Sequence, residues 1–413
     1  MHHSEPNPSE RLVETALALM ASRAGGPGLR DIAAAAGVSP SLINYRYGNI
    51  DTLMAAARVA SLEQDARRWA TCQRDLLSAP VSRSDLAGLL NELLIGETRP
   101  DDQLAALRWL RILGVARGHT GQAGPFSNAE QEFWALLGSK LDLSSGQTHT
   151  LKAFFHGLAF GHLIGAASPG FHAWSSSLVD RFTQRLLGRP VSWTCADSAW
   201  RSMAAQASEP TAGIRSEHPT RQALLEAAIQ IMTDEGVNAL THRRLATEAH
   251  ASVSSVTHFF NGRRAILKDA YTLLYQRLCQ RALSQLEYKD EAGSLTPRAL
   301  AERLTASDQQ GAQSNRTELI GLLNAMFEAS RDTETVQLAL SLFARSGETS
   351  RNLLRCLPGF EDGAGWLDAQ IFRLVSNGLV FLSPDEAPGT GTSEGARMND
   401  RLGDALTLLF SRH

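Results

Sequence analysis

The chain contains an internal repeat, and this feature limits its possible folds more than any other. Residues 12–20 (LVETALALM) match residues 224–232 (LLEAAIQIM) at an offset of 212. Positions 32–47 match positions 245–260 at an offset of 213, so the two copies differ by one residue in a loop. A match of this extent predicts two copies of one folding unit in a single chain.

A second match marks the end of each copy. Gly161 corresponds to Gly378 at an offset of 217, which gives each copy a length of about 190 residues. Between the copies, residues 189–215 are rich in proline, glycine and small polar residues, which is typical of a linker. A short helix is expected inside it, over residues 197–206.

The composition is that of a folded soluble protein of two or three domains. The 413 residues exceed the roughly 250 to 300 at which single cores stop growing. Hydrophobic residues make up 43% of the chain and charged residues 20%. Apolar residues recur at spacings of three and four, and alternating runs of β-branched residues are absent, so we expect an all-α fold.

No membrane span or secretion signal is predicted. The longest apolar stretch, residues 151–167, is interrupted by Lys152, His156 and His162. Residues 1–8 lack the basic and apolar segments of a signal peptide, so we expect a cytoplasmic protein. Four widely spaced cysteines are expected to remain reduced thiols: Cys72, Cys195, Cys279 and Cys356.

Near the start of each copy we predict two short helices joined by a tight turn. In the first copy, residues 28–36 form a helix, and a second helix begins at Pro40 with Ser39 as its N-cap. In the second copy, Thr241 caps the first helix and residues 250–252 form the turn. The inward side chains of the first helix are Ile32, Ala33 and Ala36.

The second helix of each copy has an exposed face of small polar and aromatic residues. Ile43 and Tyr47, four residues apart, face inward in the first copy. Val256 and Phe260 do so in the second copy. The outward residues are Ser41, Leu42, Asn44 and Tyr45 in the first copy, and Ser254, Ser255, Thr257 and His258 in the second.

Either segment alone is also consistent with an ordinary pair of core helices, since most short helical hairpins bind nothing. Two copies in the same register favour a functional face, because packing explains repeated exposed polar and aromatic residues poorly. Such a face suits the major groove of DNA.

Both copies resemble the N-terminal DNA-binding domain of the tetracycline-repressor (TetR) family. In that family an AGVS turn precedes a recognition helix that ends in an NYHF- or TYHF-like box. Here residues 36–39 (AGVS) and 249–252 (AHAS) precede the boxes 44–47 (NYRY) and 257–260 (THFF). The resemblance covers about 45 residues of each copy and implies two recognition helices in successive major grooves, carried by one polypeptide.

The resemblance implies an all-α pseudo-dimer of two TetR-like repeats that binds double-stranded operator DNA and is released by a small-molecule inducer. No cofactor, metal or catalytic residue is expected. The implied segments are helix-turn-helix domains at 1–54 and 216–268, helical ligand-binding bundles at 55–188 and 269–413, and a linker at 189–215. The implied DNA-binding residues are Ser39, Pro40, Ser41, Leu42, Asn44, Tyr45, Arg46, Thr241, Arg243, Ser252, Ser254, Ser255, Thr257, His258, Phe259 and Arg263.

The two units differ in charge. The family usually has a lysine just after the recognition helix, where the first copy has Ile50 and the second has Arg263. Residues 1–50 hold four basic and four acidic residues, whereas residues 215–268 hold seven basic and five acidic ones. Because phosphate contacts supply most non-specific affinity, we expect the second unit to anchor the complex and the first, with Arg46 on a phosphate, to refine specificity. Since the exposed faces also differ, the expected operator is asymmetric.

Three glycines four residues apart share one predicted helix face, and their counterparts at offset 217 include two leucines. The glycines are Gly157, Gly161 and Gly165, and the counterparts are Leu374, Gly378 and Leu382. The leucines of one copy are expected to fill the gaps of the other. It is an equally good explanation that the glycines accommodate neighbours within their own copy.

By resemblance the aromatic-rich bundles house the inducer, although aromatic residues at helical spacing are more often plain core. The candidate ligand-binding residues are Trp109, His119, Phe133, Trp134, Phe155, His156, Phe327 and Trp366. His156 and His162 are six apart and are expected to be satisfied or exposed rather than a zinc pair. Residues 391–395 match GxSxG, but their composition indicates a loop rather than a nucleophile.

The alternative function is a helical small-molecule-binding or scaffold protein in which one or both DNA-binding units are inactive. The neutral charge of residues 1–50 and Ile50 favour it, and Arg263 opposes it. An enzyme has no supporting set of residues and ranks third.

Overall fold

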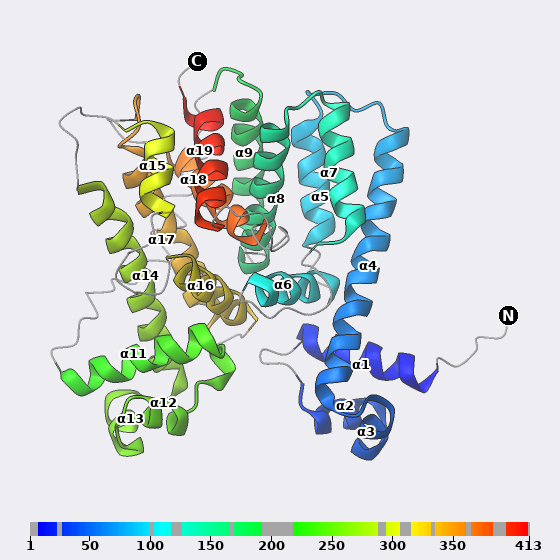
Figure 1. The fold of residues 1–413 in the computed structure, drawn as a ribbon, viewed down its shortest axis with the longest axis vertical. Coiled ribbons are helices and arrows are strands. Elements are labelled where there is room, and N and C mark those ends of the chain that lie inside the picture. Colours follow the sequence, from blue (N-terminus) through cyan, green and yellow to red (C-terminus); the bar gives the residue numbers. More distant parts are fainter. Residues whose placement is uncertain are drawn as a thin grey trace.

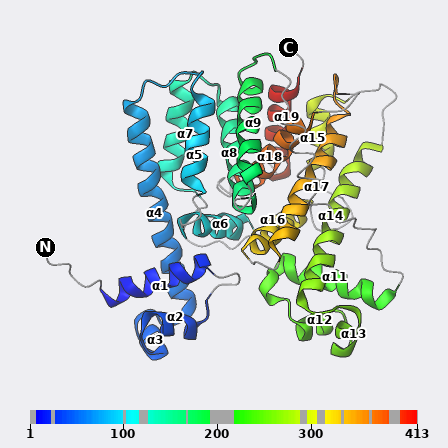
Figure 2. The same cartoon turned by 180° about the vertical axis from the view of Figure 1, so that it is seen from behind.

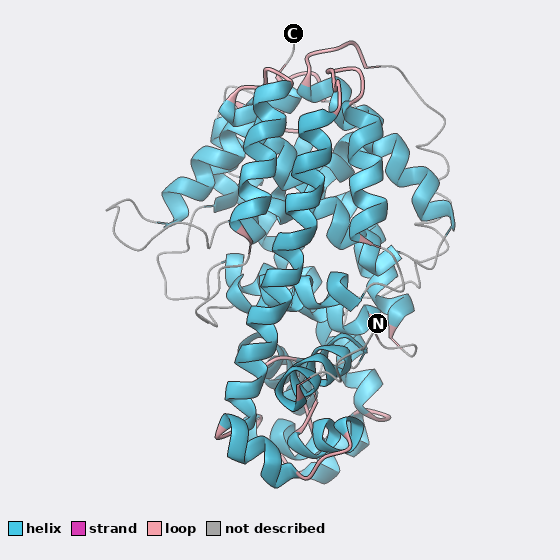
Figure 3. Cartoon of the chain, turned by 90° about the vertical axis from the view of Figure 1, so that its right-hand side faces the viewer, coloured by secondary structure: helices cyan, strands magenta, loops and turns pink. Residues whose placement is uncertain are grey.

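The computed structural model describes residues 7–22, 27–98, 103–116, 126–165, 169–191, 218–287, 295–305, 315–331, 335–360, 365–382 and 394–411. Within these ranges every regular element is a helix and none is a strand (Figure 3). The all-α fold expected from the spacing of apolar residues is therefore confirmed. Several predicted features lie outside the described residues: linker residues 192–215 with their short helix at 197–206, Cys195, His119, and residues 391–393 of the GxSxG string.

The described helices form two series whose first four α-helices have similar lengths. The first series is α1 (Pro8–Ser22), α2 (Leu29–Ala36), α3 (Pro40–Tyr47), α4 (Ile50–Ser78), α5 (Leu86–Glu97), α6 (Gln103–Ala116), α7 (Asn128–Lys140), α8 (Ser145–Gly165) and α9 (Pro169–Leu186). The second is α11 (Pro219–Asp234), α12 (His242–Glu248), α13 (Val253–Phe259), α14 (Arg263–Glu287), α15 (Pro297–Thr305), α16 (Asn315–Ser330), α17 (Val336–Leu354), α18 (Trp366–Leu382) and α19 (Glu394–Phe410), with a 3-10 turn at Val237–Ala239. Each series opens with a helix of 15 or 16 residues, two of 7 or 8, and one of 29 or 25.

The first three helices of each series lie at the same end of the molecule, as two separate groups (Figure 1). The long helices α4 and α14 lead from these groups into a joint bundle at the other end, and the view from behind shows the same arrangement (Figure 2). Helices α6 and α16 lie between the bundle and the two groups (Figure 1).

The buried apolar residues form one large cluster and one smaller one. The large cluster joins α4–α9 to the whole second series, including Leu245 and Val256 in α12 and α13. The smaller cluster is the core of α1–α3, with Leu53 and Ala57 of α4 and Leu107 of α6. The first group of short helices thus has a core of its own, whereas the second shares the core of the bundle.

Helices α8 and α18 cross in close contact, and glycines make that contact possible. A Cβ atom on Gly157 would lie 2.0 Å from the carbonyl oxygen of Leu374, and one on Gly378 would lie 1.8 Å from that of Ala153. Backbone therefore meets backbone, which a side chain at either glycine would prevent.

Both explanations of the glycine face are correct in part. Leu374 reaches Gly157 as expected, but with its backbone and not its side chain. The gap at Gly161 is filled by the ring of Phe343 from α17, whereas Gly165 accommodates Phe171 of its own half. Leu382 is not among the nearest neighbours of these glycines, so that pairing was wrong. Among the described helices, none is long and apolar enough to cross a membrane.

Candidate nucleic-acid interface

The first unit is a helix, a tight turn and a second helix, as predicted. Helix α2 ends at Gly37, whose φ of 66° lies in the left-handed region that glycine adopts without strain. Helix α3 then begins at Pro40, and Ile43 is fully buried. One prediction was wrong in detail, because Ser39 occupies the N-cap position but its side chain forms no capping hydrogen bond. Instead the Ser41 hydroxyl donates to Ser39 Oγ at 3.2 Å.

The outer face of α3 is polar and aromatic. Ser41, Asn44 and Tyr45 are exposed, and Tyr45 retains 88% of its accessible surface. Leu42 is half-buried, which is less exposure than the spacing predicted. A tyrosine this exposed has no packing role, so its ring is available to a partner.

The end of α3 is tied to the start of α1. Arg46 Nη1 donates to Ser9 Oγ at 2.5 Å, and the Tyr47 hydroxyl donates to the Ser9 carbonyl at 3.0 Å. These bonds fix the angle of α3 against α1. They also engage Arg46, the residue expected to meet a phosphate, although its side chain stays exposed.

The second unit has the same geometry with better capping. The Thr241 hydroxyl accepts from the Arg244 N–H at 3.1 Å, so the predicted cap is confirmed. Ser252 caps α13 by accepting from the Ser255 N–H at 3.0 Å. His250 has a φ of 51° in the turn, at the position that Gly37 holds in the first unit. Both turns therefore use one left-handed residue at the same place.

The outer face of α13 differs from that of α3. Ser252, Ser254, Thr257 and His258 are exposed, while Ser255 is half-buried. Phe259 lies between two imidazoles, with ring centroids 4.6 Å from His218 and 4.9 Å from His258. Phe259 therefore packs against its own unit, which its position in residues 257–260 (THFF) did not indicate.

The second unit has less unpaired positive charge than its seven basic residues suggest. Arg244 is paired with Glu235 at 2.7 Å and with Glu248 at 2.6 Å. Arg263 is exposed, but its Nη2 donates to the Val237 carbonyl at 2.8 Å. Arg243 and Arg264 are exposed as well.

The predicted ligand-binding residues do not form one site. Phe133, Trp134, Phe155 and His156 come together around Trp69, with Trp69–Phe133 centroids 5.0 Å apart and Trp134–Phe155 centroids 5.1 Å apart. Trp109 instead contacts Phe160 and Phe381 at 5.1 and 4.9 Å. Phe327 lies under Arg331, and Trp366 under Arg351. All seven of these described residues are buried.

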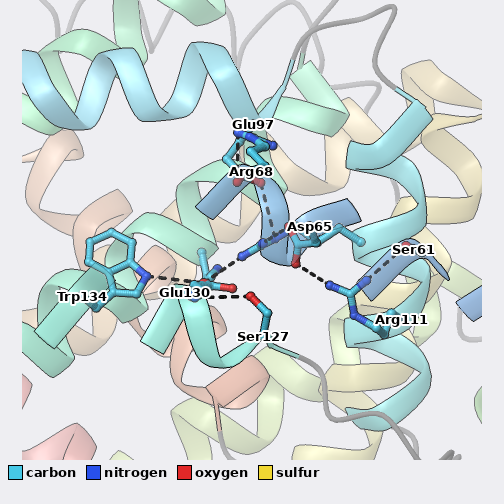
Figure 4. Close-up of polar contacts among 10 residues, drawn as sticks. Ser61, Asp65, Arg68, Glu97, Arg111, Ser127, Glu130 and Trp134 are labelled. Carbon is cyan, nitrogen blue, oxygen red and sulfur yellow. Dashed lines mark hydrogen bonds and ion pairs between the residues drawn. The ribbon is translucent and has the colours of Figure 1, made fainter. Parts of the chain in front are cut away.

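A buried network of charges borders the Trp69 cluster, and the sequence analysis missed it (Figure 4). Asp65 of α4 accepts from Arg108 at 2.7 Å and from Arg111 at 2.6 Å, both on α6. Arg108 also pairs with Glu130 of α7 at 2.8 Å and with Glu97 of α5 at 3.4 Å. Two arginines three residues apart within an apolar helix were the signal that could have revealed this network. The network connects four helices of the first series, α4, α5, α6 and α7.

His156 completes the network as a neutral imidazole. Its Nε2 lies 3.0 Å from Glu130 Oε1, and burial lowers the pKa of His156 to about 4 even though Glu130 favours the charged form. Burial acts to raise the pKa of Glu130, but Arg108 and His156 bring it below its usual range. His156 and His162 are both buried, so the option that they are exposed was wrong. Among the described residues, no group of three or more His, Cys, Asp or Glu is placed to hold a metal.

We expect acid to destabilise the protein partly through His156. The unfolded chain binds a proton near pH 6.5, whereas the folded imidazole stays neutral down to about pH 4. Stability from this group is therefore full above pH 6.5 and is lost as the pH falls toward 4. Urea unfolding at pH 7.5, 5.5 and 4.5 should show a shallower decline for His156→Gln than for the wild type. The pKa of His149 is also lowered to about 4, so the free energy of unfolding should still fall with pH in both the wild type and His156→Gln. Identical slopes in the two proteins would contradict the contribution assigned to His156.

Comparison with known proteins identifies the second helix-turn-helix unit. Residues 224–270 match the family model described as bacterial regulatory proteins, tetR family. These residues hold most of α11, all of α12 and α13, and the start of α14. No curated protein matched the chain. The chain is therefore similar to bacterial regulatory proteins of the tetR family over its second helix-turn-helix unit, where the match coincides with the capped geometry described above.

Proposed function

We propose that this TetR-type regulator is a repressor that binds an asymmetric operator as a single-chain pseudo-dimer and leaves it when a small-molecule inducer binds. The observation that carries the proposal is the position of two helix-turn-helix groups at one end of the molecule (Figure 1). Two such groups suit successive major-groove sites on one duplex. We assign the groups to residues 1–54 and 216–268, the bundles to 55–188 and 269–413, and the linker to 189–215.

The asymmetry of the operator follows from unlike side chains at equivalent positions. Tyr45 and Asn44 on α3 correspond to His258 and Thr257 on α13. A phenol and an imidazole present different donors and acceptors to base edges, as do an amide and a hydroxyl. A palindrome would suit at most one of the two faces.

Contacts between the bundle and the first unit support inducer control. Leu107 and Leu110 of α6 pack in the core of α1–α3. Arg331, just after α16, donates to the Met20 and Ala21 carbonyls at the end of α1. The first unit is therefore held by helices from both series, and a ligand that prefers another bundle arrangement would displace α3 relative to α13.

Selection of binding sites from random DNA with the full chain tests this function. We expect a site with two different half-sites, and binding that weakens steeply with salt while surviving competitor DNA. A perfect palindrome would refute the asymmetric pseudo-dimer. Binding without sequence preference would refute the repressor itself.

We expect Tyr45→Ala to weaken binding to the selected site about 10-fold or more, since one good base contact contributes about 1–3 kcal/mol. Affinity for random DNA should change little, and the fold should be unaffected because Tyr45 is exposed. Leu77→Ala, at an exposed apolar position on α4 away from α3, is the matched control. Equal losses on selected and random DNA would contradict a base contact by Tyr45.

The second candidate is a ligand-binding protein whose first unit is inactive. The balanced charge of residues 1–50 and the hydrogen bond that engages Arg46 favour it. A footprint that covers only the half-site of α13 would support this candidate, and one that covers both half-sites would reject it.

A further inference from the structure

Arg373 of α18 is a buried guanidinium without a counter-ion. Only 5% of its surface is exposed, and none of the described carboxylates pairs with it. Its Nε donates to Gln370 Oε1 at 2.7 Å, and its Nη2 has no acceptor. The phenol of Tyr275 on α14 is the acid that would favour the charged form of Arg373. Burial raises the pKa of that phenol well above its usual value, so the phenol stays neutral. The site therefore carries a positive charge and no negative one.

The other buried arginines show that this is unusual for the chain. Arg108 and Arg111 share Asp65, and Arg181 lies 3.8 Å from Asp368. His156, the residue 217 positions before Arg373, has Glu130 at 3.0 Å. Burial lowers the pKa of Arg373 to about 9, so the group is still charged at neutral pH. Desolvating a charge without a partner is costly, and such a group persists where a function requires it.

A second unpartnered donor lies beside Arg373. The hydrogen bond from Arg373 fixes which end of the Gln370 amide is oxygen, so the other end is the NH2 group. That Nε2 is fully buried and has no acceptor. Two adjacent donors without acceptors suit a carboxylate, which accepts several hydrogen bonds through two oxygens.

The surroundings indicate that the remainder of the ligand is apolar. The guanidinium carbon lies 3.7 Å from the centroid of Phe343, which covers the face of the group and leaves its N–H edge for an acceptor. Phe171 and Trp174 of α9 lie 5.8 and 6.4 Å from the same ring. A single guanidinium matches one negative charge. We propose that Arg373 and Gln370 bind the carboxylate of a small apolar monocarboxylic acid between α17, α18 and α9.

This proposal rests on the proposed function only where it takes the bound acid to be the inducer. Its test uses protein without DNA. Arg373→Met removes the unpaired charge and keeps an apolar side chain of similar length. Without ligand, we expect its Tm to rise by about 2 °C or more. Arg351→Met is the matched control, because Arg351 also lies over a ring, at 5.4 Å from Trp366, but is half-buried and has other partners. A fall in the Tm of Arg373→Met would show a structural role and overturn the proposal.

Ligand binding is measured by the same melting assay with benzoate, phenylacetate and octanoate at millimolar concentration, each beside its neutral amide. At least one acid should raise the Tm of the wild type by 2 °C or more, while its amide does not. The shift should vanish in Arg373→Met. Arg373→Lys keeps the charge but loses the planar set of guanidinium N–H donors, and should bind the acid about 10-fold more weakly. No acid-specific shift, or a shift that survives in Arg373→Met, overturns the proposal, and in either case the DNA selection still decides the proposed function.

Discussion

Asp368→Ala is expected to lower the free energy of unfolding by about 3–5 kcal/mol, because it leaves buried arginines of the other half without a counter-charge. Arg185 of α9 forms two parallel bonds with Asp368 of α18, both at 3.0 Å, and Arg181 lies 3.8 Å away. Arg185 is further held over Phe360 and Phe410 and donates to the Leu409 carbonyl. The side chains of Arg185 and Arg181 are only 19% and 9% exposed, so removal of Asp368 leaves two largely desolvated charges without compensation. Urea unfolding followed by circular dichroism measures the loss.

Asp404→Ala is the matched control for this prediction. Asp404 also pairs with an arginine, Arg298, at 2.9 Å, but both side chains are more than half exposed. Exposed pairs contribute about 0–1 kcal/mol, so the control should remain near the wild type. Similar losses in the two variants would mean that the Asp368 contact does not hold the halves together.

Asp65→Ala is expected to lower the free energy of unfolding as much as Asp368→Ala does, although Asp65 and its partners all lie in the first half of the chain. Its two oxygens bind Arg108 and Arg111, which are almost fully buried. Glu97 and Glu130 remain near Arg108, while Arg111 keeps a hydrogen bond to Ser61 at 3.1 Å. Losing the shared carboxylate removes compensation from two guanidinium groups at once, and we expect a loss of about 3–5 kcal/mol.

The same substitution on the same helix provides the control, since Asp75 is an exposed residue of α4. Asp75→Ala should change the free energy of unfolding by less than about 0.5 kcal/mol. Thermal unfolding with near-UV detection follows the tryptophans beside the network, including Trp69 and Trp134. If Asp65→Ala unfolds with the wild-type midpoint, the network is not a source of stability.

Local chemistry made the helix-turn-helix units predictable. Pro40 marks a helix start by its own backbone preference, and it was placed correctly. Gly37 was placed in the turn, where it adopts the left-handed region. Thr241 was likewise recognised as a cap, because capping depends on residues within one turn. Ser39 shows the limit, since its hydroxyl bonds to Ser41 and not to a backbone N–H.

Features that depend on distant residues were not predictable in the same way. Arg108 and Asp65 are 43 positions apart and meet only because α4 packs on α6. The glycine face of α8 was visible in the sequence, but the approach of a backbone carbonyl at Gly157 depends on the crossing angle of two helices. The sequence also gave no reason to separate Arg244, which is neutralised by two carboxylates, from Arg243, which is exposed.

The close crossing of α8 and α18 has a consequence for folding during synthesis. Gly157 and Leu374 are 217 residues apart, so their contact forms only after the second half has left the ribosome. At about 5–20 residues per second, the glycine face of α8 waits roughly 10–40 s for its partner. During that interval the first half exposes a strip of apolar helix that the finished protein buries completely. Nascent chains of this protein are therefore expected to need chaperone protection for longer than their individual helices would suggest.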